Sequence, residues 1–228
     1  MPTVFITGAS RGIGFEFARQ YSGAGWTVHA GARDPGKADA LKSLANSKLS
    51  IHKLDVTDHD EIARVAAALA GTPIDLLINN AGMWIGDDEA FGRFSDEQWM
   101  QQFRLHVLAT MAMCEAFVDN LALSEKKLIV NISSGNGCFG IDRGAGLFPY
   151  DSSKAALNTV TKGLSCELNS RGITVVSFTP GFVATDMSGP EADLTPQESI
   201  SGMREVISVL DLSMTGRFIR YNGVQLPW

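Results

Sequence analysis

The stretch Thr3–Gly14, which reads TVFITGASRGIG, decides how this chain is expected to fold. A short apolar run leads at once into a loop that carries Gly8, Gly12 and Gly14, and an amphipathic pattern begins where the glycines end. Glycine allows a tight turn and a close approach of the backbone to an anion, and a helix N-terminus favours negative charge. The stretch therefore predicts a strand, a phosphate-binding turn and a helix. The alternative is a glycine-rich turn that binds no ligand.

The same alternation of short apolar runs and longer amphipathic stretches continues along the chain. Strands are expected over Val4–Thr7, Thr27–Gly31, Ser50–Leu54, Leu76–Asn79, Leu128–Ile132, Thr174–Phe178 and Arg217–Arg220. Helices are expected over Ile13–Ser22, Lys37–Leu44, Asp60–Leu69, Asp96–Leu121, Tyr150–Asn169 and Pro196–Leu210. Such alternation indicates βαβ units and a parallel sheet covered on both faces. We therefore expect an α/β fold, a single doubly wound Rossmann-type parallel sheet of about seven strands with helices on both faces, and one domain over residues 1–228.

Composition limits the kinds of partner and compartment. The 228 residues are 45% hydrophobic and carry a net charge of −6, which argues against a nucleic-acid or membrane surface as partner. Cys114, Cys138 and Cys166 are odd in number and lack metal-ligand spacing, so they indicate a reducing compartment and no metal site. No signal peptide opens the sequence and no apolar run reaches membrane-spanning length. The sequence therefore predicts a cytoplasmic protein.

The ends of the first two strands predict the kind of ligand. In doubly wound sheets, ligands bind outside the carboxyl ends of the strands. The glycine spacing after the first strand lacks the Lys-Ser/Thr ending of a P-loop and indicates a dinucleotide site. The second strand ends in Ala32-Arg33, with no acidic residue for an adenosine ribose hydroxyl, and Arg11 adds a second positive charge. Two arginines suit the extra phosphate of NADP(H). The alternative is that they face solvent, with Asp34 paired to Arg33.

Tyr150 and Lys154 form the second pattern that indicates chemistry. They stand four residues apart in an expected helix, so their side chains share one face. An ammonium near a phenol favours the phenolate and lowers the tyrosine pKa, which makes Tyr150 a candidate proton donor near neutral pH. The alternative is a chance pairing, because this spacing is common.

Six motifs in order give the chain a family resemblance. They are Thr7-Gly-Ala-Ser-Arg-Gly-Ile-Gly14, Asp55-Val56, Asn79-Asn-Ala-Gly82, Asn131-Ile-Ser-Ser134, Tyr150-Asp-Ser-Ser-Lys154 and Pro180-Gly181 with Thr185. From residue 3 to the C-terminus, the chain resembles a short-chain dehydrogenase/reductase. The segment Thr179–Pro190, Glu198-Ser199 and the ending Leu226-Pro-Trp228 further resemble the C-factor-like carbonyl reductase branch.

The resemblance implies a role for each motif in binding NADP(H). The residues that would hold the phosphates and the ribose are Gly8, Ser10, Arg11, Gly12, Ile13 and Gly14, with Arg33 at the extra phosphate. Asp55 and Val56 would contact the adenine. Asn79, Ala81 and Gly82 would line the adenosine ribose and the path to the nicotinamide. The nicotinamide carboxamide would meet Pro180, Gly181, Val183 and Thr185.

The resemblance also implies the catalytic residues for reduction of an aldehyde or ketone by NADPH. Tyr150 would be the general acid, and Lys154 would bind the nicotinamide ribose and lower the tyrosine pKa. Ser134 would hydrogen-bond the carbonyl oxygen where negative charge develops. The family usually has asparagine where this chain has His106, which makes the fourth catalytic position a departure. A histidine supplies the same backbone carbonyl, and its ring either packs in the helix or joins the proton path.

The expected substrate is a small, apolar carbonyl or alcohol compound. We expect the pocket to be built from the loop over residues 135–149 and the segment after Thr185. Four large apolar residues in or beside these segments support this, and the one arginine among them is Arg143. These four are Phe139, Phe148, Phe182 and Met187. Trp84 is expected either to face the substrate or to be buried under the loop.

Other features leave alternatives open. His29, His52 and His59 show no metal spacing and are expected to be structural. Apolar residues lie on more than one face of the helices that begin at Asp96 and Tyr150, which favours a homo-oligomer, a dimer or a tetramer. Besides a reductase, the pattern fits a dinucleotide-binding signalling or regulatory protein with incidental activity. An epimerase or dehydratase is disfavoured because little chain follows Gly181.

Overall fold

The computed structural model describes residues 1–44, 47–85, 91–141, 147–189 and 191–228. Over these residues the strands form one sheet in the order β3-β2-β1-β4-β5-β6-β7-β8. The strands are β1 (Thr3–Ile6), β2 (Thr27–Ala32), β3 (Leu49–Lys53), β4 (Leu76–Asn79), β5 (Leu128–Ile132), β6 (Thr174–Thr179), β7 (Phe218–Arg220) and β8 (Gln225–Leu226). All neighbours pair in parallel except β7 and β8, which are antiparallel. The expected doubly wound sheet is confirmed.

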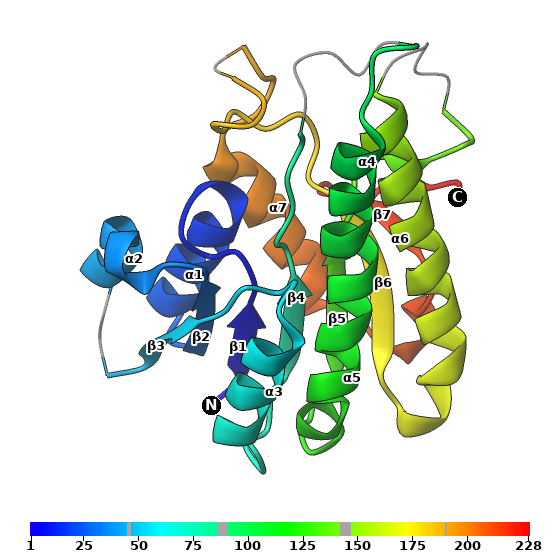
Figure 1. The fold of residues 1–228 in the computed structure, drawn as a ribbon. Coiled ribbons are helices and arrows are strands. Elements are labelled where there is room, and N and C mark those ends of the chain that lie inside the picture. Colours follow the sequence, from blue (N-terminus) through cyan, green and yellow to red (C-terminus); the bar gives the residue numbers. More distant parts are fainter. Residues whose placement is uncertain (45–46, 86–90, 142–146, 190) are drawn as a thin grey trace.

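Helices cover both faces of this sheet (Figure 1). They are α1 (Gly12–Gly23), α2 (Asp39–Ser43), α3 (His59–Ala68), α4 (Asp96–Phe103), α5 (Ala109–Ala122), α6 (Phe148–Glu167) and α7 (Pro196–Ser208). Buried residues of α1, α2 and α7 form one apolar layer with the sheet, and those of α3, α5 and α6 form the other.

The strand sequences are apolar throughout because both faces are buried. In β1, Val4 and Ile6 belong to the layer of α1 and α7, while Phe5 between them belongs to the layer of α3 and α5. Each of the three is fully buried. A strand buried on one face only would alternate apolar and polar residues, so the unbroken apolar runs identified the parallel sheet correctly.

The chain reverses its winding between β1 and β4. Sequence order runs outward from β1 through β2 and β3, and then resumes on the other side of β1 with β4. The loops that follow β1 and β4 diverge from this point at the carboxyl ends of the strands, at the top of Figure 1. A doubly wound sheet binds its ligand at such a switch point.

Three elements differ from the sequence expectation. The helix expected over Asp96–Leu121 contains a π-helical turn, Arg104–Leu108. The helix expected from Lys37 begins at Asp39, because Asp34 caps a separate 3₁₀ turn at Pro35–Lys37. Strand β8 was not expected, since two residues are too few to show a periodicity.

The sequence showed no apolar run of membrane-spanning length, but one helix of the structure has the length and composition of a membrane span. The helical stretch Asp96–Ala122 has 27 residues and is long and apolar enough to cross a membrane by length and composition. Half of its most apolar window is buried inside the protein, where α5 packs against β4 and β5. A core helix of this kind passes the same test as a membrane span, so the stretch carries no conclusion about a membrane.

Candidate active site

A cleft of about 540 Å³ opens at the switch point. Sixteen residues expected from the sequence line it, namely Gly8, Ser10, Arg11, Gly12, Ile13, Gly14, Arg33, Asp55, Val56, Ala81, Gly82, His106, Tyr150, Lys154, Pro180 and Thr185. They come from the loops after β1, β2, β3, β4 and β6, from the first turn of α1, from the π-helical turn Arg104–Leu108 and from α6. Residues far apart in sequence therefore meet in one cavity, as the strand-end argument predicts. Ser134, Asn79, Gly181 and Val183 do not line it.

The glycine loop is fixed to the segment after β4 by backbone contacts. Gly8 has φ +64°, and a Cβ at Gly14 would collide with the Gly8 carbonyl oxygen. The Asn80 amide nitrogen donates to the carbonyl oxygens of Thr7 at 2.9 Å and Gly8 at 3.2 Å. The Thr7 hydroxyl accepts from the backbone N–H groups of Asn80 at 2.9 Å and Ala81 at 3.0 Å. Both glycines are therefore required by the close approach of two backbones.

Asn79 lies in the core instead of at the ribose. Its side-chain Nδ2 donates to the side-chain Oδ1 of Asn131 at 2.9 Å, and Nδ2 of Asn131 donates to the Thr161 hydroxyl at 2.9 Å. These bonds join β4, β5 and α6 beneath the cleft. Asn79 is the last residue of β4 and its side chain is directed into the core, so Asn80 takes the position at the cleft that we expected for Asn79.

The first turn of α1 fits a phosphate group. Gly12, Ile13 and Gly14 line the cleft, and the N-cap residue Arg11 makes no side-chain bond to this turn among the described residues. The backbone N–H groups at the start of a helix lack partners within the helix and favour an anion. A Cβ at Gly12 would come no closer than 3.6 Å to the Thr185 side chain, so the loop leaves room above it. The residues present therefore fit a dinucleotide.

Two arginines expected at the cofactor line the cleft. Arg33 is exposed at the end of β2 and lines the cleft. Asp34, the alternative partner considered for Arg33, instead accepts from the Gly36 backbone at 3.0 Å and pairs with Lys37 at 3.4 Å. Arg11 forms an exposed ion pair with Asp186 at 3.1 Å. Arg33 thus has no ion-pair partner among the residues that the structure describes.

Lys154 is buried beside Tyr150 on α6. The lysine is 5% exposed, its Nζ donates to the Ile132 carbonyl oxygen at 3.0 Å, and it lies 5.7 Å from the centroid of the Tyr150 ring. Burial lowers the pKa of Lys154 to about 7. Removal of an ammonium from water disfavours its charged form, which is the cause of this lowered pKa. The expected juxtaposition of the phenol and the amine is present.

The Ser134 loop is packed directly on α6. The Ser134 Oγ accepts from the Asn136 backbone N–H at 3.1 Å, at the start of the 3₁₀ turn Gly135–Gly137. A Cβ at Gly137 would lie 2.7 Å from the Lys154 carbonyl carbon, so only glycine fits there. The adjacent Ser133, which the sequence did not single out, lines the cleft and donates to the Lys154 carbonyl oxygen at 3.5 Å.

His106 lies in the π-helical turn and is 1% exposed. Its Nε2 accepts from the Met83 backbone N–H at 3.1 Å, and its Nδ1 is 2.8 Å from the Ser153 hydroxyl. The imidazole meets the Tyr150 ring edge-on, with 5.7 Å between centroids. Burial first, and the charge of Lys154 second, hold the pKa of His106 well below its usual range.

The segment after β6 forms the next part of the wall. Pro180 and Thr185 line the cleft as expected, whereas Gly181 and Val183 do not. Gly181 has φ +84°, and a Cβ there would lie 2.6 Å from the Leu194 side chain. Val183 is buried and forms a β-bridge with Leu194.

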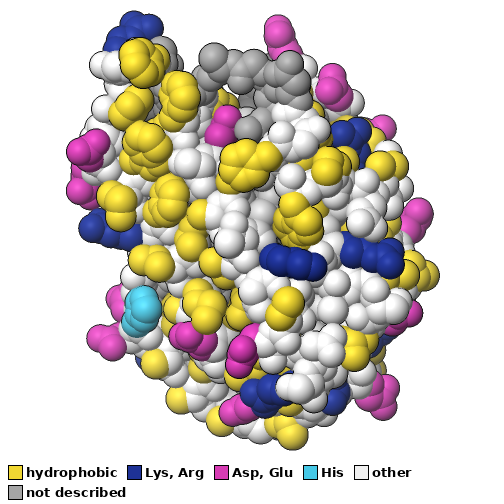
Figure 2. Space-filling view, turned by 90° about the vertical axis from the view of Figure 1, so that its right-hand side faces the viewer, with side chains coloured by type: hydrophobic (Ala, Val, Ile, Leu, Met, Phe, Trp, Pro, Cys, Tyr) yellow, Lys and Arg dark blue, Asp and Glu magenta, His cyan; other side chains and the backbone are white. Residues whose placement is uncertain are grey.

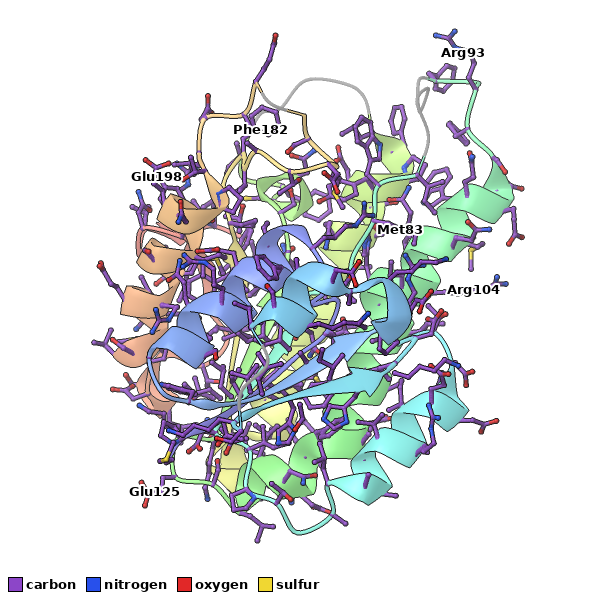
Figure 3. The ribbon with its side chains drawn as sticks, turned by 90° about the vertical axis from the view of Figure 1, so that its left-hand side faces the viewer. Met83, Arg93, Arg104, Glu125, Phe182 and Glu198 are labelled. Carbon is purple, nitrogen blue, oxygen red and sulfur yellow. The ribbon has the colours of Figure 1, made fainter. Side chains whose placement is uncertain are left out.

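The remaining wall of the cleft is largely apolar. Met83, Trp84 and Met187 line it, and Trp84 is 42% exposed, so the tryptophan is not buried under the loop. Met83 on the segment after β4 and Phe182 on the segment after β6 lie at the same end of the sheet (Figure 3). Phe139, Phe148 and Phe182 are exposed and do not line the cleft. Arg143 lies outside the described residues.

Several lining residues were not predicted from the sequence. They are Leu54, Thr57, Asn80, Met83, Leu105, Ile132, Ser133 and Asp186. Most are direct neighbours of predicted residues, so the end of each strand located them to within a residue or two. Met83 and Leu105 meet only because the segment after β4 packs beside the π-helical turn, a contact with no local sequence pattern.

The C-terminal residues brace the loop that follows Ser134. The Cys138 thiol donates to the Pro227 carbonyl oxygen at 2.9 Å, and a Cβ at Gly140 would lie 2.6 Å from the Pro227 ring. Trp228 stacks on Phe218 with 5.7 Å between ring centroids. Trp228 therefore packs on β7 and does not line the cleft.

The outer face of α4, α5 and α6 carries exposed apolar side chains. Met100, Leu108 and Met111 on this helical stretch are at least one-third exposed. Figure 2 shows hydrophobic side chains on this side of the molecule, with charged ones scattered among them. Within the described residues, no group of three or more His, Cys, Asp or Glu side chains is arranged to hold a metal ion.

Comparison with known proteins agrees with this geometry. The short chain dehydrogenase family model matches residues 2–194. An uncharacterized oxidoreductase of Schizosaccharomyces pombe is 33% identical over 98% of this chain and 96% of its own length. The C-signal protein of Myxococcus xanthus is 33% identical over 68% of this chain and 93% of its own length. The NADPH-bound carbonyl reductase from chicken fatty liver has a TM-score of 0.93, with 32% identity and coverage of 100% of this chain and 99% of that chain.

Proposed function

The chain belongs to the short chain dehydrogenase family, and on this basis we propose that it reduces an aldehyde or a ketone to an alcohol with NADPH. One observation carries the proposal. The phosphate-binding turn of α1 and the pair Tyr150 and Lys154 open on the same cleft. A protein that only bound a dinucleotide would have no need of a proton donor there.

The residues divide the chemistry between them. NADPH, when bound, supplies the hydride that reduces the carbonyl carbon. Tyr150 donates a proton to the carbonyl oxygen, which becomes the alcohol oxygen. Ser134, whose Oγ accepts a hydrogen bond from the Asn136 backbone N–H, is assigned by the family resemblance to donate its own hydroxyl proton to the carbonyl oxygen. Lys154 holds the nicotinamide ribose and favours loss of the Tyr150 proton.

The preference for NADP(H) rests on charge. Arg33 borders the cleft without an ion-pair partner among the described residues, and Arg11 of the glycine loop, which forms an exposed ion pair with Asp186, also lines it. A dianionic phosphate between guanidinium groups makes strong, charge-assisted hydrogen bonds. Support also comes from the chicken carbonyl reductase, whose structure contains NADPH.

We further propose an apolar substrate, a cytoplasmic location and a homo-oligomer. Met83, Trp84 and Met187 support the apolar substrate, because they line the cleft beside Tyr150. The exposed apolar side chains of α4 and α5 support self-association through that face. The net charge of −6 disfavours nucleic acid or an anionic membrane as partner.

The experiment is a substrate panel with the purified protein. Aromatic and aliphatic aldehydes and ketones are incubated with NADPH, its oxidation is followed by absorbance, and the alcohol product is identified by mass spectrometry. We expect turnover of apolar members of the panel. Absence of turnover for every member, with NADPH bound, would contradict the proposal.

The match to the C-signal protein favours a second candidate, a dinucleotide-binding signalling or regulatory protein. One variant, Tyr150→Phe, distinguishes the reductase from the signalling protein. A signalling role that needs only the bound dinucleotide would survive Tyr150→Phe, whereas a reductase role would be lost with the phenol. The Tyr150 phenol beside the buried Lys154 supports the reductase, because dinucleotide binding alone can use the lysine at the ribose but needs no proton donor.

A further inference from the structure

His106 lies at the centre of a hydrogen-bond chain that joins two walls of the cleft. The Met83 backbone N–H donates to Nε2, so Nε2 is an acceptor and the neutral ring carries its proton on Nδ1. Nδ1–H then donates to the Ser153 hydroxyl at 2.8 Å, and that hydroxyl donates to the Tyr150 carbonyl oxygen at 2.7 Å. With the proton on Nδ1, every donor in this series of hydrogen bonds has an acceptor.

The two ends of the chain are both functional positions. Met83 lines the apolar part of the cleft, one residue after Gly82. Tyr150 lies in the first turn of α6, where the Ser153 bond holds its carbonyl and the edge-on imidazole packs against its ring. A shift of His106 would therefore move the substrate-side backbone and the proton donor relative to each other.

The local structure makes room for the imidazole. A π-helical turn inserts an extra residue into the helix and redirects the side chains around it. Gly82 faces the ring, and a Cβ there would lie 3.4 Å from Nε2, closer than most such contacts. The His106 side chain is thus enclosed by a glycine on one side and by α6 on the other.

The same contacts argue against a proton-carrying imidazole. A protonated ring donates from both nitrogens, so the Met83 N–H would lose its acceptor inside the protein. The added charge would also be repelled by the charge of Lys154, which already lowers the pKa of His106. Both effects keep the ring neutral while the two bonds persist.

We propose that His106 is a positioning residue that clamps the Met83 backbone to the first turn of α6 and so fixes Tyr150 relative to the substrate. It does not carry the proton. The proposal rests on the proposed function only where it names Tyr150 as the acid. The clamp itself is a statement about two hydrogen bonds.

Two amide variants separate the ends of the clamp. The Asn side-chain amide reaches the position of Nδ1, so His106→Asn retains the Ser153 bond and loses the Met83 bond. The longer Gln amide reaches Nε2, so His106→Gln retains the Met83 bond and loses the Ser153 bond. We expect His106→Asn to raise KM for the carbonyl substrate about 3- to 10-fold, and His106→Gln to lower kcat by a similar factor.

Ser153→Ala is the matched control, because it removes the same link as His106→Gln from the other side. The double variant should then be no worse than either single variant, since both break one chain. If the losses of activity in the two single variants multiply in the double variant, the clamp is overturned. It is also overturned if every variant loses kcat/KM equally and in proportion to a lower Tm.

The pH dependence of kcat distinguishes positioning from proton transfer. We expect the same profile shape for wild type, His106→Asn and His106→Gln, with only the plateau lowered. Loss of a kinetic pKa in both variants would assign the proton to the imidazole and overturn the proposal.

Two measurements need no activity, so they distinguish failure of the clamp from failure of the proposed reductase. Nitrogen-15 NMR should show His106 as the neutral Nδ1–H tautomer at pH 7. Exchange of the Met83 amide hydrogen should be slow in wild type and His106→Gln and at least tenfold faster in His106→Asn. Equal exchange in all three proteins, or the opposite tautomer, would overturn the clamp even in an active enzyme.

Discussion

The two walls of the cleft are built in different ways. The wall formed by the loops after β1 and β4 is held by backbone contacts, with Gly8 and Gly14 fitted against Asn80 and Ala81. The other wall is formed by large side chains that remain partly exposed, Trp84 further along the segment after β4 and Met187 on the segment after β6. Backbone contacts leave little room for substitution, whereas exposed side chains can change without disturbing the core. The cofactor side is therefore constrained by the fold, and the substrate side is constrained by the ligand.

The largest expected effect comes from loss of the proton donor, which should abolish turnover and leave cofactor binding intact. Tyr150→Phe keeps the ring but removes the proton, so we expect kcat to fall about 10²- to 10⁴-fold while NADPH still binds. Steady-state rates and NADPH fluorescence titration measure the two effects. Lys154→Ala provides the contrast, since it should damage turnover and cofactor binding together. Substantial turnover by Tyr150→Phe would remove Tyr150 as the acid.

The cofactor wall is tested at its charged end. Arg33→Ala removes a charge-assisted bond to the extra phosphate and should weaken NADPH binding about 10- to 150-fold, with NADH binding little changed. Isothermal titration with both cofactors measures this. Lys37→Ala, a nearby exposed lysine paired with Asp34, is the matched control and should have no effect. Unchanged NADPH affinity in Arg33→Ala, or a wild type that prefers NADH, would contradict the assignment.

Acid should weaken the cofactor half of the sheet. His29 and His52 lie on β2 and β3 with 3.0 Å between ring nitrogens, and burial, with His52 second, lowers the pKa of His29 to about 4. The unfolded chain binds this proton below pH 6.5, and the folded protein binds it only near pH 4. Stability is therefore complete above pH 6.5 and is lost as the pH falls to 4.

We expect this loss to be about 2 kcal/mol in the free energy of unfolding, measured by urea denaturation between pH 7 and pH 4. His29→Leu should reduce that pH dependence. His59→Leu is the control, because His59 is an exposed residue at the start of α3. The same acid sensitivity in His29→Leu as in wild type would rule out His29 as its source.

Substitution of a side chain in the apolar wall should have the smallest effect on catalysis. Trp84→Ala removes apolar contact area from the cleft, so we expect KM for a bulky aromatic ketone to rise about 3- to 10-fold and KM for a small aldehyde to change little. Phe139→Ala is the control, since Phe139 is 83% exposed and does not line the cleft. A strict requirement for a carboxylate or phosphate on the substrate would instead show that the wall is not selected for apolar compounds.

What the sequence predicted well was local. The glycine loop, the end of β2 and the Tyr150–Lys154 spacing each lie within one or two elements, where steric rules and helix periodicity apply directly. We did not predict the π-helical turn or the partners of His106. We also expected Asn79 at the cleft, where the structure has Asn80. Successive side chains at the end of a strand point to opposite faces, so a one-residue uncertainty there reverses the assignment between core and cleft. The contact of His106 with Met83 depends on how two distant segments pack, which no local pattern encodes.

The contact between Pro227 and the loop at Cys138 has a consequence for how the chain is made. The segments that form the phosphate-binding half, residues 3–82, are synthesised first, and they complete four neighbouring strands of the sheet. The loop that follows Ser134 can form its bond from Cys138 to Pro227 only after Pro227, 89 residues further along the chain, has been synthesised. During translation, the residues 3–82 proposed to bind phosphates are therefore available before the loop after Ser134 forms its contact with Pro227.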